Sequence, residues 1–275
     1  MRQDDRDLVA QLCAARAGLK VDADKAYLIE SRLAPVARRE GFGALADMLA
    51  VLREHREDRL AWAVVEAMAH GESAFFRDRE PFALFRDEVL PTLARARGGQ
   101  PVRIWSAACA SGQEVYSLAM IIEDERARIP GLKVELFGTD IGERQLEKAQ
   151  SGLYTQFEIQ RGLPIRQLVR HFEQADDMWR ISPRIRQMIR WRRVNLVSDL
   201  STAGRFDVIL CRYVLSALVE PMKGRLLINL ARALSPEGFL FLGEGESVAG
   251  LSDAFQPVSG RPGLFARNPA YRVAA

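Results

Sequence analysis

Cysteine and histidine are scarce in this sequence, and neither is spaced for disulfide formation or metal binding. The three cysteines lie far apart and include no CxxC pair, which argues against both a disulfide framework and a thiolate zinc site. The three histidines are scattered, with no second ligand at metal-binding spacing. We therefore expect reduced, mostly buried thiols, no metal ion, and no catalysis by a histidine.

Long apolar runs are missing as well. No stretch approaches the roughly 18 uncharged apolar residues of a membrane span, and the N-terminal MRQDDRDLVAQL carries acids where a secretory signal needs basic and then apolar residues. Hydrophobic residues make up 48% of the chain and charged residues 27%, which are ordinary values for a globular protein. The composition predicts a cytoplasmic protein without membrane insertion.

The net charge of +3 is small, but the positive charge is unevenly distributed. Between Arg161 and Arg193 there are nine arginines and only three acidic residues. This basic region either faces an acidic partner or is the solvated surface of a small subdomain. A nucleic acid is not the expected partner, because the chain has no DPPY- or NPPF-like run and the region offers only Trp179 and Trp191 as stacking platforms.

The first hundred residues are predicted to be helical. Apolar residues recur at helical spacing between residues 7 and 69, which indicates four or five short helices. A further helix is expected over residues 79–97, followed by the loop ARARGGQP. With about 150 residues per domain as a guide, we expect a helical domain at 1–70 and an interdomain linker with its helix at 71–100.

From residue 101 onward, strands alternate with helices. VRIWSA, VELFGTD, FDVILCR and FLFLGEG are extended apolar runs, and the alternation predicts a mainly parallel sheet covered on both faces. A turn is expected at residues 235–238, and the tail FQPVSGRPGLFARN predicts a terminal antiparallel hairpin around residues 259–263. We therefore expect an α/β domain at 101–275 with a Rossmann-like sheet of the methyltransferase type.

The alternation of strands and helices lapses between residues 154 and 195. There, WRI, a proline-containing turn and IRWRRV follow one another without a long helix. We interpret this stretch, at about residues 155–194, as a small inserted β-subdomain rather than another strand and helix of the sheet.

The ends of the strands indicate the ligand, because ligands of open α/β sheets bind outside the carboxyl ends of the strands. The turn at residues 110–112, Ala-Ser-Gly, has small residues that let a backbone approach a ligand closely, but it is not a GxGxxG phosphate cradle. We therefore expect a nucleoside ligand without a pyrophosphate.

Two acidic residues near these strand ends are candidate ligand contacts. Glu114 lies in the first helical turn, where it either accepts a hydrogen bond from a ligand ammonium or stabilises the helix N-terminus. Asp140 ends the second strand, where nucleotide-binding sheets place an acid that accepts both ribose hydroxyls; it can also cap the next helix, and both roles can hold. S-adenosylmethionine satisfies these features together.

The ordered set RIWSAACASGQEVYSLAM, LFGTDIGERQLEKAQSGLY, VNL, FDVILCRYVL and LSPEGFLFLGEGES, preceded by KAYLIESRL and ESAFFRD, resembles the CheR-type chemotaxis receptor methyltransferases over almost the whole chain. The resemblance implies a class I methyltransferase sheet preceded by an all-α domain. It also implies transfer of a methyl group from S-adenosylmethionine to glutamates on the cytoplasmic methylation helices of chemoreceptors, with S-adenosylhomocysteine as product.

The resemblance implies a set of site residues as well. Arg77 is the expected catalytic residue, which holds and orients the acceptor carboxylate; a surface salt bridge with Asp78 or Glu80 is the alternative role. A glutamate carboxylate is already ionised at pH 7, so no general base is needed. The residues expected to bind the cofactor are Gly71, Ser73, Arg77, Glu114, Asp140, Asn195, Leu196, Cys211 and Arg212, with Asn195 and Leu196 near the adenine.

The chain also departs from the family pattern. Gly71 and Ser73 stand where the family usually has Asn and Thr, and CRYVLSAL replaces the usual CRNVLIYF, so that Tyr213 replaces Asn and Ala217 replaces Tyr. These changes keep open an alternative function, a CheR-like protein that binds S-adenosylmethionine or S-adenosylhomocysteine and signals with little catalysis or with a non-receptor substrate.

Two further expectations concern recognition of the receptor. Family members that dock on a receptor's C-terminal pentapeptide tether carry a Gly-x-Gly turn in the inserted subdomain, and ADDMWRISPRIRQMIRWRR has none, so we predict tether independence. The family uses basic residues of its second helix against the acidic methylation helices. Here the candidates are Arg32, Arg38 and Arg39, with a solvated helix face as the alternative.

The stretch HGESAFFRDREPF precedes the sheet and carries two adjacent phenylalanines. We expect Gly71 to end the helical domain and Ser73 to cap the next element. Phe75 and Phe76 are predicted to point in opposite directions, one into each domain, and so to fix Arg77 over the cofactor's methyl group.

Overall fold

The computed structural model describes residues 1–55, 57–69 and 71–271, and the chain forms two compact units. The first unit consists of Met1–Gly71 together with Ser216–Lys223, and the second of Glu72–Leu215 with the described residues from Gly224 onward. His70, the first residue of the phenylalanine-containing stretch, lies outside the described residues. The segment 72–100, expected to be a linker with its helix, is thus part of the second unit.

The first unit is helical, as the spacing of its apolar residues predicted. Its helices are α1 (Gln3–Ala17), α2 (Ala26–Arg39), α3 (Leu45–His55) and α4 (Asp58–Met68). Each turns an apolar stripe inward, and Val9, Leu33 and Leu60 are fully buried there. The segment 216–223 joins this unit through an isolated bridge between Leu19 and Leu218.

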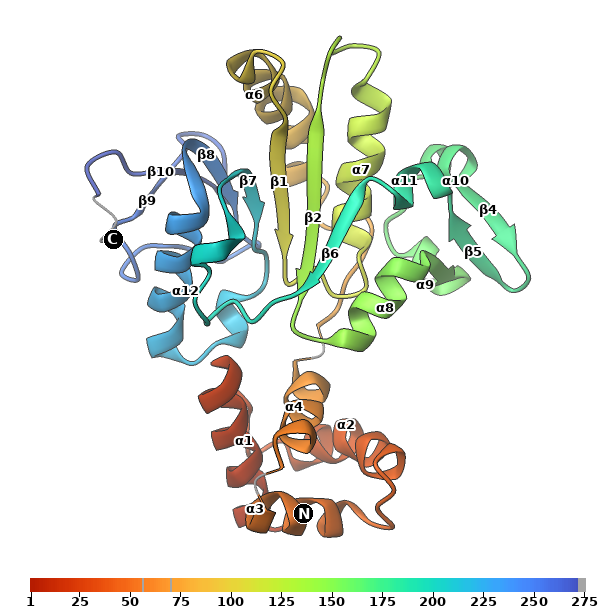
Figure 1. Cartoon of the computed structure of the whole chain (residues 1–275), viewed down its shortest axis with the longest axis vertical. Coiled ribbons are helices and arrows are strands. Elements are labelled where there is room, and N and C mark those ends of the chain that lie inside the picture. The colour runs from red at the N-terminus through yellow and green to blue at the C-terminus, as the bar shows by residue number, and fades with distance from the viewer. Residues whose placement is uncertain (56, 70, 272–275) are drawn as a thin grey trace. The chain divides into compact units, whose positions relative to one another are not determined.

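The second unit contains a seven-stranded sheet in the order β6-β2-β1-β7-β8-β10-β9 (Figure 1). Its strands are β1 (Val102–Ala107), β2 (Val134–Asp140), β6 (Ile189–Arg193), β7 (Phe206–Leu210), β8 (Leu234–Phe241), β9 (Phe255–Pro257) and β10 (Leu264–Arg267). All neighbouring strands are parallel except the two pairs that involve β10. The predicted Rossmann-like sheet with a terminal antiparallel hairpin is confirmed.

Helices and short helical turns precede and connect these strands, and of these segments Ser216–Lys223 belongs to the first unit. They are α5 (Glu80–Leu84), a π-helical turn (Phe85–Val89), α6 (Leu90–Arg97), α7 (Gln113–Glu125), α8 (Glu143–Ser151), α12 (Glu220–Ala233) and two 3₁₀ turns (Ser201–Ala203 and Leu215–Ala217). Helix α7 is buried along nearly its whole length, with Val115, Leu118 and Ala119 fully buried. The first strand and α7 are therefore central parts of the core of this unit.

A small second sheet follows α8, as the lapse in the alternation predicted. Its strands are β3 (Leu153–Thr155), β4 (Phe172–Ala175) and β5 (Met178–Ile181), in the antiparallel order β3-β5-β4, with α9 (Gln156–Gln160), α10 (Ile165–His171) and α11 (Pro183–Arg186) around them. Figure 1 shows β4 and β5 at the right, beyond the main sheet. The inserted β-subdomain of the predicted fold is confirmed.

The expected end of this insert, near residue 194, is wrong. IRWRR forms β6, which pairs in parallel with β2 as an edge strand of the main sheet. Ile189 is buried and Trp191 half-buried, whereas Arg190 and Arg192 are exposed, so the strand alternates between core and solvent. Charged side chains are common on such edges because they hinder pairing with other chains.

The turn expected at residues 235–238 is also corrected, because these residues belong to β8. Phe206 of β7 lies opposite Leu234, but Val208, two positions later, lies opposite Phe239. The additional residues on β8 form an irregularity of the β-bulge type. The Pro-Glu-Gly signal marked this interruption of the ladder, not a turn between helix and strand.

Candidate active site

The carboxyl ends of β1, β2 and β7 meet where the order of the sheet reverses, with β1 paired on one side to β2 and on the other to β7. In open α/β sheets this reversal leaves a crevice at the carboxyl ends of the strands, where ligands bind. Glu114 lies in the helix after β1, Asp140 is the last residue of β2, and Arg212 follows β7. The topology therefore brings three of the sequence-predicted residues to one edge of the sheet.

The turn after β1 has an unusual backbone. Ala108, Ala110 and Gly112 have φ values of 56°, 47° and 90°, in the left-handed region that alanine rarely adopts. A Cβ on Gly112 would lie 2.9 Å from Cβ of Ala149 and 3.0 Å from the ring of Trp191. Gly112 is thus needed for the approach of α8 and β6, whereas the sequence suggested that it serves the approach of a ligand.

Asp140 connects this turn to the end of β2. Its Oδ2 accepts a hydrogen bond of 2.8 Å from the backbone N–H of Ala110, and its Oδ1 accepts one of 2.8 Å from the N–H of Gly142. Gly142 is the N-cap of α8, so the carboxylate fixes the entry to that helix without being the cap itself. These bonds do not by themselves exclude ribose hydroxyls, because an ionised carboxylate accepts about four hydrogen bonds.

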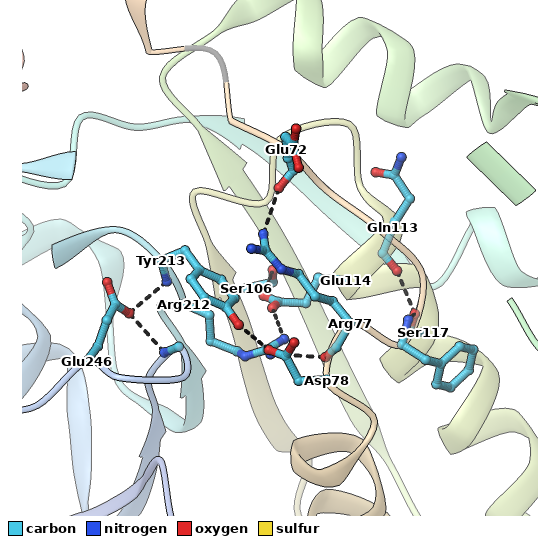
Figure 2. A network of polar contacts seen from close by, with 12 residues as sticks. Glu72, Arg77, Asp78, Ser106, Gln113, Glu114, Ser117, Arg212, Tyr213 and Glu246 are labelled. Carbon is cyan, nitrogen blue, oxygen red and sulfur yellow. Dashed lines mark hydrogen bonds and ion pairs between the residues drawn. The ribbon is translucent and has the colours of Figure 1, made fainter. Parts of the chain in front are cut away.

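A buried arginine organises the polar groups between β1 and β7 (Figure 2). The Arg212 side chain is only 1% exposed; its Nη1 donates to Oε2 of Glu114 over 3.0 Å, and its Nη2 forms an ion pair with Asp78. Ser106 on β1 donates to the other Glu114 oxygen, Oε1, over 2.8 Å. A buried cation needs such partners, because an uncompensated charge in this position would cost several kcal/mol. Glu114 is therefore bound to Arg212 and Ser106, not to the end of its own helix.

Arg77 differs from Arg212 in its partners. Its Nη1 donates to the backbone carbonyl of Glu72 over 3.1 Å, and its Cζ lies 3.6 Å from the ring centroid of Tyr213. The Asp78 carboxylate does not bind Arg77; it accepts hydrogen bonds from Arg212 and from the Tyr213 hydroxyl. Among the described residues Arg77 forms no ion pair, so the alternative role in a surface salt bridge is not realised.

This arrangement leaves Arg77 with chemistry suited to an anion. A guanidinium carries five N–H donors and remains charged at any physiological pH. Its neighbours here are a carbonyl and an aromatic ring, which do not neutralise it. It can therefore bind a carboxylate with two parallel hydrogen bonds, the strongest geometry available to such a pair.

The two phenylalanines before Arg77 both anchor the segment in the second unit. Phe75 is fully buried, with its ring edge-on to Tyr154 at 4.9 Å and to Phe172 at 5.6 Å. Phe76 packs on Phe82 at 5.4 Å. The expectation that they would anchor two different domains is therefore wrong, because the inserted subdomain supplies the aromatic pocket for Phe75.

The backbone around Arg77 is strained. Phe76, Asp78 and Arg79 have φ values of 49°, 67° and 43°, and Tyr213 has one of 62°. Each left-handed residue other than glycine costs roughly 1 kcal/mol or more. Such strain persists only where surrounding contacts impose it, and it is concentrated at functional sites.

Sequence reasoning missed Asp78 and Glu246 as members of this site. Oε2 of Glu246 accepts hydrogen bonds from the backbone N–H of Tyr213 over 2.7 Å and of Gly243 over 2.9 Å. Glu246 could have been found from the acidic GEGES that follows β8. Because β8 is parallel to β7, it ends at the same edge of the sheet as β7. No sequence signal pointed to Asp78, because the orientation of its side chain depends on the strained backbone of the turn.

Asn195, Leu196 and Cys211 lie in the loops after β6 and β7. Oδ1 of Asn195 accepts the N–H of Val197 over 3.3 Å, and Leu196 is 8% exposed. Cys211 is completely buried, and burial raises the pKa of its thiol well above the usual range, so the thiol stays protonated. Its expected role near a ligand is thus limited to packing and backbone contacts.

Gly71 and Ser73 are the remaining expected residues. Gly71 is exposed and belongs to the first unit, and a Cβ placed on it would meet no atom within 4 Å. Ser73 is half-buried and belongs to the second unit. The predicted cap at Ser73 has no counterpart, since the first helix of this segment, α5, begins only at Glu80.

Two classes of site are not found in the described part of the chain. Over residues 1–55, 57–69 and 71–271, no group of three or more His, Cys, Asp or Glu side chains is arranged to hold a metal ion. No described helix combines the length and the apolar character that a membrane span needs.

Comparison with known proteins gives the family. The family described as "CheR methyltransferase, SAM binding domain" matches residues 71–264. The chain belongs to the CheR methyltransferase family. This confirms the predicted family and the predicted cofactor, S-adenosylmethionine, and it identifies the polar edge of the sheet as belonging to a methyltransferase domain.

Similar CheR proteins match over almost their full length. Chemotaxis protein methyltransferase 1 of Pseudomonas aeruginosa is 36% identical over 254 residues, covering 91% of this chain and 92% of that protein. The chemotaxis protein methyltransferase of Vibrio parahaemolyticus is 36% identical over 266 residues, covering 96% of each. Among solved structures, PKMT2 from Rickettsia typhi in complex with AdoHcy covers 63% of this chain and 26% of its own, with 15% identity and a TM-score of 0.38, too distant a likeness to bear on function.

Proposed function

We propose that this CheR-family protein transfers the methyl group of S-adenosylmethionine to glutamate side chains of chemoreceptors, giving glutamyl methyl esters. The observation that carries the proposal is Arg77, a cation at the carboxyl edge of the sheet whose partners in the structure are a carbonyl and an aromatic ring. An anionic acceptor completes that arrangement. The names of the similar proteins from Pseudomonas and Vibrio support chemotaxis as the process.

The chemistry needs alignment more than proton transfer. A free glutamate side chain has a pKa of about 4.3, so the acceptor arrives ionised and a carboxylate oxygen attacks directly. S-adenosylmethionine supplies a methyl group on a sulfonium, whose S–C bond breaks as the O–C bond forms, which leaves the neutral thioether S-adenosylhomocysteine. Arg77 orients the carboxylate, and the alignment of the two reacting atoms lowers the barrier. With no proton to remove from the acceptor, the reaction needs no catalytic histidine.

The residues of the strand ends fit such a cofactor by their chemistry. The Asp140 carboxylate suits the two ribose hydroxyls, and Glu114 suits the ammonium of the amino-acid part, with Arg212 holding its carboxylate in place. Asn195 and Leu196 suit the adenine. We propose the full set Gly71, Ser73, Arg77, Glu114, Asp140, Asn195, Leu196, Cys211 and Arg212 as cofactor-binding residues.

We also propose that the receptor is recognised at its cytoplasmic methylation helices without the pentapeptide tether. The turn between β4 and β5 consists of Asp176 and Asp177, with φ of Asp176 at 54°, and has no Gly-x-Gly. A protein that acts on these helices works in the cytoplasm. Calorimetric titration with a tether pentapeptide is expected to give no heat of binding, and a measurable affinity would contradict this part of the proposal.

The function is tested with the purified protein, a receptor cytoplasmic fragment and S-adenosylmethionine labelled in the methyl group. Glutamyl methyl esters release labelled methanol in alkali, so base-labile label on the receptor is the expected result. Titration with S-adenosylhomocysteine in the same preparation separates two kinds of failure. Binding without transfer would favour the signalling alternative, and neither binding nor transfer would contradict the cofactor site as well.

A further inference from the structure

We propose that Tyr213 is a positioning residue for the methyl acceptor: its ring supports the guanidinium of Arg77, and its hydroxyl helps to keep the Asp78 carboxylate away from that guanidinium. The inference rests on the proposed function, and it names the residue that keeps Arg77 available to a glutamate. It concerns Arg77, Asp78 and Tyr213, all within the second unit (Figure 2).

The guanidinium of Arg77 stacks on the ring of Tyr213. The separation of 3.6 Å between Cζ of Arg77 and the ring centroid of Tyr213 corresponds to direct contact over the face of the ring. A guanidinium donates its hydrogen bonds in its own plane, so a ring against its face uses none of its donors. One donor reaches the Glu72 carbonyl, and among the described residues the others have no partner and remain for an acceptor. The ring therefore fixes the orientation of the guanidinium without reducing its capacity to bind a carboxylate.

The Asp78 carboxylate is held by residues other than Arg77. This carboxylate is adjacent in sequence to Arg77 and would be an obvious internal partner, which would compete with a substrate carboxylate. Instead, Oδ2 of Asp78 accepts hydrogen bonds from the Tyr213 hydroxyl and from Arg212. Asp78 is thus held by two donors on the segment after β7.

Tyr213 is itself held in place by Glu246 and Gly243. Its backbone is in the left-handed region, with φ of 62°, and its N–H donates to Glu246 over 2.7 Å. A Cβ on Gly243 would lie 2.7 Å from the Tyr213 nitrogen and 2.9 Å from its ring atom Cδ1, so the ring packs directly on the glycine backbone. A ring held in this way can keep the stacked Arg77 guanidinium in a fixed position.

These contacts predict an effect on the acceptor and not on the cofactor. Tyr213→Leu removes both the ring face and the hydroxyl, and we expect the KM for the receptor fragment to rise about 3- to 30-fold, the range that a cation–π contact supports. The kcat should change less, and the Kd for S-adenosylhomocysteine should stay within about twofold. Tyr213→Phe keeps the ring and should restore the KM to within about threefold of the wild-type value. Tyr271→Leu, at a tyrosine outside this network, is the matched control.

The kinetic result can also contradict the proposal. An unchanged acceptor KM in Tyr213→Leu would overturn it, and so would a loss of S-adenosylhomocysteine affinity as large as the change in KM, because Tyr213 would then be a structural or cofactor residue. Failure of Tyr213→Phe to restore the KM would overturn the role of the ring.

A second measurement keeps the inference separate from the proposed function. In a proton–nitrogen-15 correlation spectrum of the wild-type protein, the proton shift of the Arg77 Nε–Hε group should be displaced by the ring current of Tyr213. The shift should persist in Tyr213→Phe and Tyr271→Leu and disappear in Tyr213→Leu. If the wild-type protein methylates no glutamate, the proposed function is wrong, and this shift alone decides whether Tyr213 positions Arg77; its absence from the wild-type spectrum would overturn the positioning role.

Discussion

Arg77 carries its positive charge beside an acidic neighbour that is already engaged. The Asp78 carboxylate is bound by Arg212 and Tyr213. The neighbouring arginines Arg77 and Arg212 therefore have different roles: Arg212 binds the internal carboxylates, and Arg77 stays available to a substrate carboxylate. Arg212 is buried and compensated by Glu114 and Asp78, whereas Arg77 is half-buried and has neutral partners. At the scale of single residues, the site is built around this difference in compensation.

Replacement of Arg77 tests that difference. In Arg77→Ala we expect kcat/KM for the receptor fragment to fall about 100-fold or more, because a charge-assisted, two-bond contact with the acceptor is lost. Arg77→Lys should recover only part of this loss, since an ammonium cannot form the same planar pair. Arg79→Ala, at an exposed arginine of the same turn, is the control and should retain activity. Equal losses in Arg77→Ala and Arg79→Ala would point to a general disturbance of the turn.

The turn of residues 72–79 is held by several elements at once. Phe75 packs on aromatic residues of the inserted subdomain, the N–H of Phe76 donates to Ser117 of α7 over 3.0 Å, and the Arg77 carbonyl accepts from Arg212 over 3.0 Å. These contacts impose the left-handed conformations of the turn. At the scale of elements, the inserted subdomain therefore helps to hold the turn that carries Arg77 in place.

Gly162 offers a test of the contact between the inserted subdomain and the turn of residues 72–79. It has φ of +106°, and a Cβ on it would lie 2.2 Å from the Phe75 carbonyl oxygen, which is backbone and cannot rotate away. Gly162→Ala should therefore lower the free energy of unfolding by roughly 2–4 kcal/mol and reduce methyl transfer by displacing the turn. Gly131→Ala is a matched control, because Gly131 has φ of +75° and a Cβ on it would meet no atom within 4 Å, so it should cost only about 1 kcal/mol. Denaturant unfolding of both variants measures the difference, and equal costs would refute the contact with Phe75.

The same elements show how far the sequence alone could lead. Helical spacing predicted the helices of the first unit, because each buries one regular face, and extended apolar runs predicted β1, β2, β7, β8 and the terminal hairpin. The same patterns assigned IRWRR to the insert because an edge strand with arginines on its outer positions looks like a surface hairpin. Glu114 and Asp140 were predicted from their places in the first helical turn after β1 and at the end of β2, whereas Arg212 was implied by the family resemblance. Asp78 was not, because its partners lie more than 130 positions away in the sequence and local patterns carry no such information.

At the scale of the whole molecule, two proposals remain to be tested. One is the division into domains at 1–70, 71–100 and 101–275, to which the compact units add that residues 72–100 group with the sheet. The other is recognition of acidic receptor helices by α2. There, Arg32 donates to the Met68 carbonyl and Arg39 to Glu40, whereas Arg38 is exposed and forms no ion pair among the described residues. Arg38 is thus the arginine of this helix most available to a partner.

Charge reversal at Arg38 tests the role of α2. Arg38→Glu should raise the KM for the receptor fragment about 3- to 10-fold at low salt, with a smaller effect at high salt, because exposed charges are screened. Arg95→Glu, at an exposed arginine of α6, makes the same change of net charge and should have little effect. Steady-state kinetics at two salt concentrations measures both variants, and equal behaviour would leave α2 a solvated face.

The central claim, that this protein methylates glutamate carboxylates held by Arg77, is tested most directly by tandem mass spectrometry of a receptor cytoplasmic fragment. The fragment is incubated with S-adenosylmethionine and either the wild-type protein, Arg77→Ala or Arg79→Ala. We predict methyl esters on specific receptor glutamates with the wild-type protein and with Arg79→Ala, and their near-complete loss with Arg77→Ala. Absence of methylated glutamate with a wild-type protein that binds S-adenosylhomocysteine, or equal methylation by Arg77→Ala, would contradict the account.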